Sequence, residues 1–493
     1  MAETAPLLPG LLQQRLAGIL LHPTSLPGPA VNGDLGDDAY RFVDFLARTG
    51  QRVWQVLPLG PTHNDLSPYQ SLSAFAGNRH LISLHRLVEW GWLHVSEVVI
   101  REPYELSRVM AHALQMFSSR ASQSEQDEWR EFCAKAEGWL DDYALYCVIR
   151  QEQHMRAWCE WPEPLRWRSP DALREVRSRH SDEIEAIRFE QFLFYRQWQQ
   201  LKRYANEKGV QLFGDMPIFV GHDSADVWSQ PEGFLLDTAG QPSVVAGVPP
   251  DYFSQTGQRW GNPHYDWEWM AKNDFQWWRE RVAWHMQMLD LVRIDHFRGF
   301  EASWEIPASE ATAINGRWVK APGEQLFNRL LQQFGKLPLV AEDLGIITPE
   351  VEALRDRYGF PGMRILQFAF EGGPANPYLP YNHTPNSVVY TGTHDNDTTL
   401  GWFNNLNRDL QTHILHFLGD VREAMPWPLI RATHASVARL AIIPIQDLLA
   451  LGEEHRMNIP GTTQGNWRWR FQWEWLEGDM ERKLLETTRL YGR

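Results

Sequence analysis

Eight short apolar segments run through the 493-residue chain, and each of them ends in polar residues. In chain order they are AGILLHPTS (17–25), RVWQVLPLG (52–60), VQLFGDMPIFV (210–220), LVRIDHF (291–297), LPLVAEDLG (337–345), GMRILQFAF (362–370), SVVYTGTHD (387–395) and RLAIIPIQDLL (439–449). Continuous apolar runs of this length are typical of parallel strands that are buried on both faces. The pattern therefore predicts a sheet of eight parallel strands.

Helical patterns occupy intervals between these strands. They lie at DDAYRFVDFLARTG (37–50), DFQWWRERVAWHMQMLD (274–290), GEQLFNRLLQQFG (323–335) and TPEVEALRDRYGF (348–360). The last of these opens with Thr-Pro-Glu, an N-cap followed by a proline in the first turn. Alternation of strand and helix is typical of the α/β class, and eight repeats predict a (β/α)8 TIM barrel. We expect one catalytic barrel domain over residues 1–493.

Two intervals are too long for a simple crossover helix. Residues 80–205, after the second strand, have a helical period and predict a helical insertion subdomain. Residues 221–273, after the third strand, include the Gly- and Pro-rich stretch VVAGVPPDYFSQTGQRWGNPHYDW and predict a long loop insertion. Long loops in compact domains are usually functional or disordered, and the aromatic residues argue against disorder. We expect residues 246–263, here called the lid loop, to cover the active site.

Charge and cysteine content exclude several classes of function. The chain has 47 Lys and Arg against 62 Asp and Glu, and this net charge of −15 argues against a nucleic-acid partner. Its three cysteines, Cys133, Cys147 and Cys159, form neither a CxxC metal pattern nor a disulfide framework. The N-terminus has no basic signal-peptide region, and no window approaches the roughly 18 apolar residues of a membrane span. We expect a cytoplasmic protein with no membrane partner, no metal and no cofactor.

Ionisable residues gather where the predicted strands stop, which is the end of a barrel that carries active sites. The third strand ends near Asp215, the fourth at Arg293 and Asp295, and the seventh at His394 and Asp395. Any one of these acids could instead be a helix N-cap or part of a loop salt bridge, and Arg293 with Asp295 could be a structural ion pair. Acids at several separate strand ends favour one shared site.

Two carboxyl groups in this set suit glycoside chemistry. Arg293 and Asp295 are two residues apart on one strand, so they share a face, and Arg293 is expected to lower the pKa of Asp295 and keep it ionised. Glu342 and Asp343 are adjacent, so one of them faces the site, where a neighbouring carboxylate would raise its pKa. An ionised carboxylate beside a carboxylic acid is the pair that glycosidases use.

The motifs RIDHFRG, VAEDLG and TGTHDNDT resemble the conserved blocks of the α-amylase superfamily of retaining glycosidases. Longer motifs are similar to those of the amylomaltases, which are 4-α-glucanotransferases also called disproportionating enzymes. These motifs are SPYQ (67–70), FGDMPIFVGHDSADVW (213–228), AGVPPDYFSQTGQRWGNP (246–263) and NIPGTTQGNWRWR (458–470). The resemblance covers residues 17 to about 475, and it implies a barrel without the C-terminal β-domain of amylases.

The resemblance also implies roles for individual residues. Asp295 would be the nucleophile, Glu342 the general acid/base, and Asp395 a third carboxylate that binds sugar hydroxyls and distorts the ring. The substrate-binding residues that it implies are Arg293, His394, Asp215, Tyr69, Trp260, Asp251 and Asn466. No catalytic position departs from the motifs of the family.

The expected reaction is transfer of α-1,4-glucan segments to the 4-hydroxyl of another glucan or of glucose, by a retaining double displacement. The expected partners are therefore α-1,4-glucans and malto-oligosaccharides, with glucose as an acceptor. Retention predicts that the Asp295 and Glu342 carboxyls lie about 5–5.5 Å apart. An α-1,4-glucan hydrolase of the same superfamily remains an alternative, and a non-catalytic glucan-binding protein is a more distant one.

Overall fold

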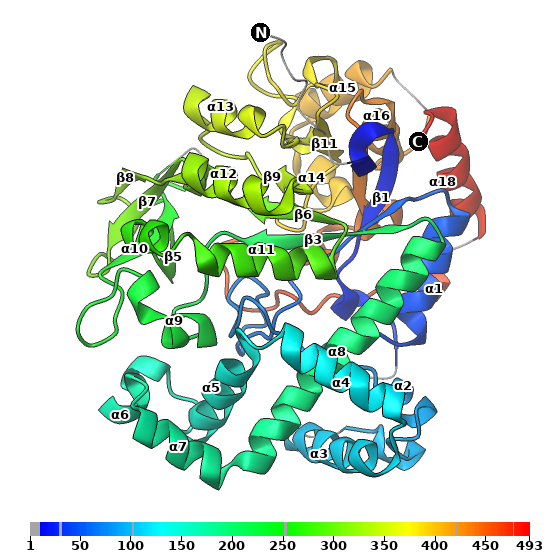
Figure 1. Cartoon of the computed structure of the whole chain (residues 1–493). Helices are drawn as coiled ribbons and strands as arrows, with labels where there is room; N and C mark the ends of the chain where they lie inside the picture. The colour runs from blue at the N-terminus through cyan, green and yellow to red at the C-terminus, as the bar shows by residue number, and fades with distance from the viewer. Residues whose placement is uncertain (1–9, 29–31, 101–102, 251–253, 420–421, 477) are drawn as a thin grey trace.

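The computed structural model describes the chain apart from residues 1–9, 29–31, 101–102, 251–253, 420–421 and 477 (Figure 1). An eight-stranded parallel sheet forms its centre, with the order β10-β11-β12-β1-β2-β3-β6-β9. The strands are β1 (Leu16–Leu20), β2 (Val53–Gln55), β3 (Gln211–Pro217), β6 (Leu291–Asp295), β9 (Leu339–Ala341), β10 (Gly362–Ile365), β11 (Ser387–Tyr390) and β12 (Leu440–Pro444). Each lies within one of the eight apolar runs or overlaps it, so the predicted α/β barrel is confirmed.

The sheet closes on itself between β9 and β10. Here the Ala341 amide donates to the Pro361 carbonyl at 2.8 Å, and the Met363 amide donates to the Asp343 side chain at 2.6 Å. Alternate residues of the strands fill the interior, among them Val53, Phe213, Leu291, Val340, Met363, Val388 and Leu440. The intervening residues face the surrounding helices, as the alternation of side chains along a strand requires.

The barrel helices predicted from the sequence are confirmed with small changes at their ends. They are α1 (Asp37–Arg48), α11 (Gln276–Met288), α12 (Gly323–Phe334) and α13 (Pro349–Arg357). The outer layer continues with α14 (Thr399–Asn405), α15 (Arg408–Phe417), α16 (Trp427–Ala435), α17 (Ile445–Leu448) and α18 (Gly478–Leu490). Between β10 and β11 the described chain forms short 3-10 turns and no α-helix, so strand and helix do not alternate throughout.

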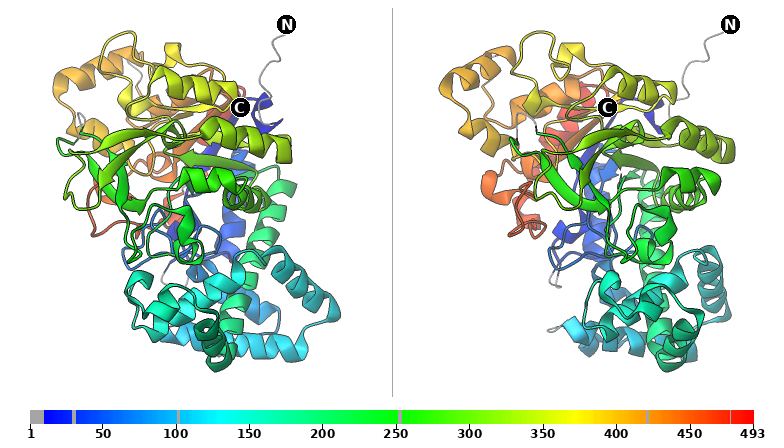
Figure 2. Two further views of the ribbon diagram at one scale, coloured as in Figure 1. Left: turned by 60° about the vertical axis from the view of Figure 1, so that its left-hand side comes forward. Right: turned by 90° about the vertical axis from the view of Figure 1, so that its left-hand side faces the viewer.

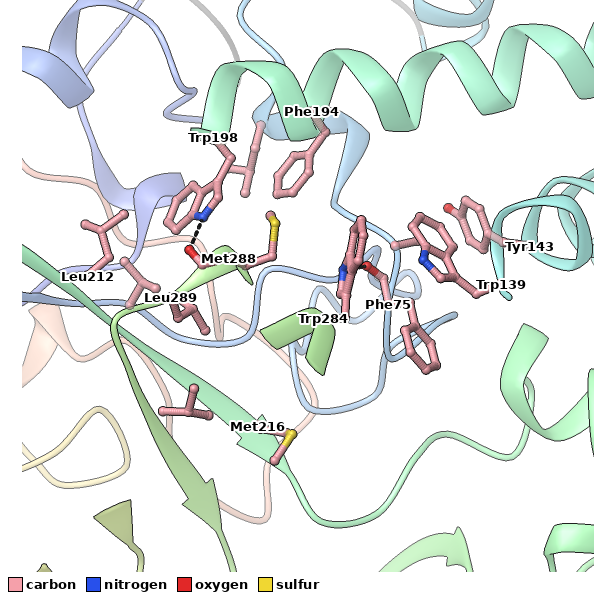
Figure 3. Packing of buried hydrophobic residues seen from close by; sticks show 14 of the residues in the cluster. Phe75, Trp139, Tyr143, Phe194, Trp198, Leu212, Met216, Trp284, Met288 and Leu289 are labelled. Atoms are coloured by element: carbon pink, nitrogen blue, oxygen red, sulfur yellow. Dashed lines mark hydrogen bonds between the residues drawn. The ribbon is translucent and has the colours of Figure 1, made fainter. Parts of the chain in front are cut away.

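The interval after β2 is helical, as predicted. It contains α2 (Leu84–Glu89), α3 (Pro103–Arg120), α4 (Gln123–Lys135), α5 (Leu140–Glu152), α6 (Glu163–Arg166), α7 (Pro170–Arg179) and α8 (Ser181–Glu207). Helices α3 to α7 form a lobe beside the barrel, and the long α8 joins the two (Figures 1 and 2). At this junction the Trp198 indole donates to the Met288 carbonyl at 2.7 Å, and the Trp284 indole donates to the Phe75 carbonyl at 2.9 Å (Figure 3).

The interval after β3 differs from its prediction, because much of it is ordered secondary structure. It contains α9 (Ala225–Ser229), β4 (Val244–Val248), β5 (Gln258–Pro263) and α10 (Trp267–Lys272). Strands β4 and β5 join β7 (Ala302–Pro307) and β8 (Arg317–Lys320) in an antiparallel sheet of order β5-β4-β7-β8. The lid loop is therefore a β-hairpin anchored on this second sheet, and its residues 251–253 lie outside the described part of the chain. No helix of the described residues has the length and apolar character that crossing a membrane requires.

Candidate active site

The carboxyl ends of β6 and β9 bring Asp295 and Glu342 together. Ile294 pairs with Ala341, and the residue after each of them is one of the two acids. The Glu342 amide donates to the Ile294 carbonyl at 3.0 Å, and the Phe297 amide donates to the Glu342 carbonyl at 3.1 Å. The two acids thus stand side by side on hydrogen-bonded neighbours, at the end of the barrel where sites are found.

Arg293 links two carboxylates inside the barrel. Its Nη2 donates to Asp295 Oδ1 at 2.7 Å, and its Nη1 donates to Asp215 Oδ2. The Arg293 side chain is 5% exposed and that of Asp215 is fully buried, whereas that of Asp295 keeps 28% of its exposure. Arg293 therefore orients Asp295 from the barrel interior, while part of the Asp295 side chain stays exposed at the mouth of the barrel.

Two backbone amides fix the Glu342 carboxyl. His296 N donates to Oε2 at 2.7 Å, and Leu344 N donates to Oε1 at 2.9 Å. His296 adopts a φ of 54°, a left-handed conformation that few residues with a side chain adopt, and this turn aims its amide at Glu342. Asp343 instead contacts Arg355 and accepts from the Met363 amide. Of the two adjacent acids, Glu342 is therefore the one that belongs to the site.

Burial changes the ionisation that was expected of this pair. Burial raises the pKa of Glu342 to about 7, against the opposing charge of Arg293. Burial also raises the pKa of Asp295, and the charges of Asp215 and Glu342 add to the rise. The prediction that Arg293 holds the pKa of Asp295 low is therefore wrong, because the effect of burial, with that of the neighbouring carboxyls added, exceeds the lowering effect of the Arg293 charge.

The two carboxyls share a proton near neutral pH and titrate as a pair. Arg293 contacts Asp295 directly, and the side chain of Asp295 is also the one that keeps partial exposure. Burial raises the pKa of Asp295 more than that of Glu342, whereas these two features favour the anion at Asp295 and the proton on Glu342. This distribution gives one carboxylate able to attack and one acid able to donate a proton.

Tyr69, His394 and Asp395 form the opposite side of the site. The Tyr69 hydroxyl donates to Asp215 Oδ2 at 2.6 Å and lies 2.9 Å from His394 Nε2. His394 Nε2 is also 3.3 Å from Asp395 Oδ2. Burial lowers the pKa of His394, so the ring is neutral, and a proton on Nε2 would be donated to the Tyr69 hydroxyl oxygen, whose own proton goes to Asp215. The predicted residues Asp215, Arg293, Tyr69, His394 and Asp395 are thus connected through hydrogen bonds and ion contacts.

Three residues that sequence reasoning did not single out complete this side. Asn458 Nδ2 donates to Asp395 Oδ1 at 2.6 Å, and Arg456 Nη2 donates to the Asp395 carbonyl at 3.0 Å. The Trp467 ring lies 5.9 Å from that of Tyr69 and 6.0 Å from that of His394. Asn458 and Trp467 belong to the motif NIPGTTQGNWRWR, which was the available signal, although the motif alone does not say which of its side chains reach the site.

The three predicted contacts from the loops have different outcomes. Trp260 lies at the edge of the site, because its ring is 4.8 Å from that of His296, the neighbour of Asp295. Asn466 accepts from the Ile459 amide at 3.0 Å and donates to the Thr462 carbonyl at 3.0 Å, so these bonds shape its own loop. Its contact with sugar stays a prediction. Asp251 lies outside the described residues.

A parallel barrel that presents two carboxyl side chains at the ends of neighbouring strands, with a third carboxylate in the same site, is typical of the class of retaining glycoside-processing enzymes. Within that class the chain belongs to the 4-alpha-glucanotransferase family, whose sequence profile matches residues 21–476.

Individual relatives are similar over most of their length. The 4-alpha-glucanotransferase of Thermus thermophilus is 51% identical over 92% of this chain and 94% of its own. That of a Synechocystis strain is 49% identical over 98% of this chain and 99% of its own. The structure of amylomaltase from Streptococcus agalactiae in complex with acarbose gives a TM-score of 0.93 at 38% identity, covering 97% of this chain and 100% of that one.

Proposed function

We propose that this enzyme transfers segments of α-1,4-glucan from a donor chain to the 4-hydroxyl of an acceptor glucan or of glucose. Malto-oligosaccharides and longer α-1,4-glucans are its substrates. The observation that carries the proposal is the placement of Asp295 and Glu342 on neighbouring strands, with Arg293 bonded to one of them and not to the other. Membership of the family supplies the substrate class.

The proposed reaction has two displacements. Asp295 attacks the anomeric carbon while Glu342 protonates the glycosidic oxygen, so that the bond to the leaving glucan breaks and a covalent glycosyl-enzyme forms. Glu342, now a carboxylate, then removes the proton from the acceptor 4-hydroxyl as that oxygen attacks the same carbon and releases Asp295. Two inversions restore the α configuration. Tyr69, His394 and Asp395 are proposed to hold the sugar whose bond is cut.

Transfer requires that an acceptor sugar compete with water, which is present at about 55 M. The carboxylates do not determine whether water or a sugar hydroxyl attacks the intermediate. Positioning of the acceptor and exclusion of water must therefore favour transfer. The hairpin of β4 and β5 offers a means, because it carries Trp260 next to His296 and is held by Gln70, which donates to Asn262 Oδ1 at 3.1 Å. We infer that this hairpin covers the acceptor side of the site with apolar surface.

Incubation with maltotriose tests the proposal. Transfer predicts glucose together with oligosaccharides longer than maltotriose, because the cleaved segment is passed to a second sugar. A hydrolase would give only shorter products, and a non-catalytic glucan-binding protein would give none. The carboxyl separation of about 5–5.5 Å that retention requires stays a prediction.

A cytoplasmic location also stays a proposal. Its support is that the three cysteines, Cys133, Cys147 and Cys159, are free thiols, as is usual for proteins of a reducing compartment. Fractionation of the cells that make the protein would test it, and recovery from an oxidising compartment would contradict it.

A further inference from the structure

Inside the barrel, four buried polar atoms near the catalytic carboxyls have no hydrogen-bond partner among the described residues. They are Gln55 Oε1, Asp215 Oδ1, Arg293 Nε and Tyr390 OH. All four residues are almost fully enclosed, with Tyr390 at 0% and Gln55 at 2% exposed. A buried polar group that lacks a partner destabilises the fold, so a cluster of them calls for a function.

The four side chains come from four different strands and point into the same interior. Gln55 ends β2 and Tyr390 ends β11, while Asp215 and Arg293 lie on β3 and β6. Their neighbours two residues earlier on the same strands are part of the apolar cluster that fills the barrel: Val53, Phe213, Leu291 and Val388. Because side chains alternate along a strand, the four polar residues form the next layer toward the catalytic end.

The chemistry of the layer is complementary. Arg293 Nε carries a proton to donate, Gln55 Oε1 and Asp215 Oδ1 accept, and the Tyr390 hydroxyl can do both. Burial raises the pKa of the Tyr390 phenol, the charge of Arg293 and the nearby Gln55 side chain act to lower it, and the charge of Asp215 adds to the rise. Tyr390 thus stays protonated, and its hydroxyl lies close enough to the other three side chains for them to act on its pKa.

We propose that Gln55 and Tyr390 are positioning residues that hold the Arg293 guanidinium at the angle at which it serves Asp295. The two terminal nitrogens of Arg293 are engaged by Asp215 and Asp295, which leaves Nε as the group by which the plane of the guanidinium is set. In this proposal Gln55 and Tyr390 interact with the guanidinium through hydrogen bonds, directly or through an enclosed water molecule. Neither residue touches substrate. The inference rests on the proposed function, because it assigns Asp295 as the nucleophile.

Removing the polar atoms while keeping the volume tests this role. Tyr390→Phe deletes one hydroxyl, and Gln55→Met replaces the amide with an apolar chain of similar length. Each is expected to lower kcat on maltotriose by roughly tenfold, a fraction of the about 100-fold that a 1 Å misplacement costs, with KM nearly unchanged. A less well oriented Arg293 stabilises the Asp295 anion less, so the acidic limb of kcat/KM should move to higher pH.

Tyr204→Phe is the matched control, because it removes a hydroxyl that donates to a carboxylate, Asp44, at 2.7 Å outside the barrel. It should leave kcat, KM and the pH profile as they are in the wild type. The inference is overturned if both interior variants match the wild type in all three quantities, or if they lose activity only through a higher KM. Total bond cleavage is the readout for the variants, while the products of the wild type alone test the proposed transfer, so the two can fail separately.

Discussion

Asn458→Asp is expected to lower kcat/KM through electrostatic repulsion alone. Asn458 lies on the loop that follows the last barrel strand, and its Nδ2 donates to Asp395 Oδ1 at 2.6 Å. The substitution exchanges this donor for a carboxylate of nearly the same shape. Two anions then face each other where a hydrogen bond stood, while the packing of the loop changes little.

The size of the effect follows from the separation and the exposure. Two unit charges 4 Å apart repel by about 4 kcal/mol at the effective dielectric of a protein surface. The Asp395 side chain is 46% exposed, so solvent screening reduces this to about 2 kcal/mol. If the transition state loses about 2 kcal/mol of stabilisation by Asp395, kcat/KM falls roughly 30-fold. Asn458→Ala loses only the hydrogen bond, about 1 kcal/mol, and should cost roughly fivefold.

Initial rates of glucose release from maltotriose between pH 5 and 8 distinguish charge repulsion from the loss of a hydrogen bond. The charge of Asp395 raises the pKa of the new carboxyl at position 458, so lowering the pH adds a proton there that restores a donor. The deficit of Asn458→Asp relative to the wild type should therefore shrink toward pH 5, whereas that of Asn458→Ala stays constant. Asn315→Asp is the control, because the exposed Asn315 donates to the carboxylate of Glu310 at 2.9 Å. A deficit for Asn458→Asp that is equal to that of the alanine variant at every pH would refute the reasoning.

Three further outcomes are expected. Asp295→Asn should abolish both transfer and hydrolysis of maltotriose while circular dichroism stays unchanged, and retained turnover would contradict its role as nucleophile. Trp260→Gly should raise the ratio of hydrolysis to transfer, measured from product sizes, because it opens the acceptor side to water. An unchanged ratio would contradict the proposed role of the hairpin in excluding water. The buried Glu342 binds its proton more tightly when folded, since its pKa rises from 4.5 to about 7, so the wild type loses stability as pH rises through that window. Glu342→Gln cannot ionise, and its melting temperature relative to the wild type should increase between pH 4.5 and 7, by the equivalent of up to about 3 kcal/mol; a constant difference would contradict the assigned pKa.

The barrel and its carboxylates were predictable because a strand that is buried on both faces needs a continuous run of apolar residues. A parallel strand reads as an apolar run, and the acids at its carboxyl end stand at the catalytic end of the barrel. That rule located Asp215, Asp295, Glu342 and Asp395. It could not separate Glu342 from Asp343, since that distinction depends on Arg355 and the Met363 amide, which approach from the neighbouring helix and strand.

Other parts of the site depend on contacts between distant segments. The hairpin of β4 and β5 is ordered by pairing with β7, which lies beyond the next barrel strand, so its own Gly- and Pro-rich sequence reads as a loop. Asn458 reaches Asp395 from a loop that returns across the barrel mouth. The raised pKa of Asp295 likewise depends on the burial of its carboxyl and on the carboxyls that other strands bring near it, and neither can be read from a local sequence pattern.

The closure of the barrel between β9 and β10 bears on how the enzyme would fail when heated. At that join a side chain, Asp343, receives the Met363 amide that a neighbouring strand would otherwise take, and Glu342 is the residue just before it. Partial openings of a fold begin where backbone pairing is sparse. Warming is therefore expected to part these two strands first and to displace the proton donor while the remaining strands stay paired. Heat inactivation should then precede the loss of the circular dichroism signal, and it should reverse on cooling.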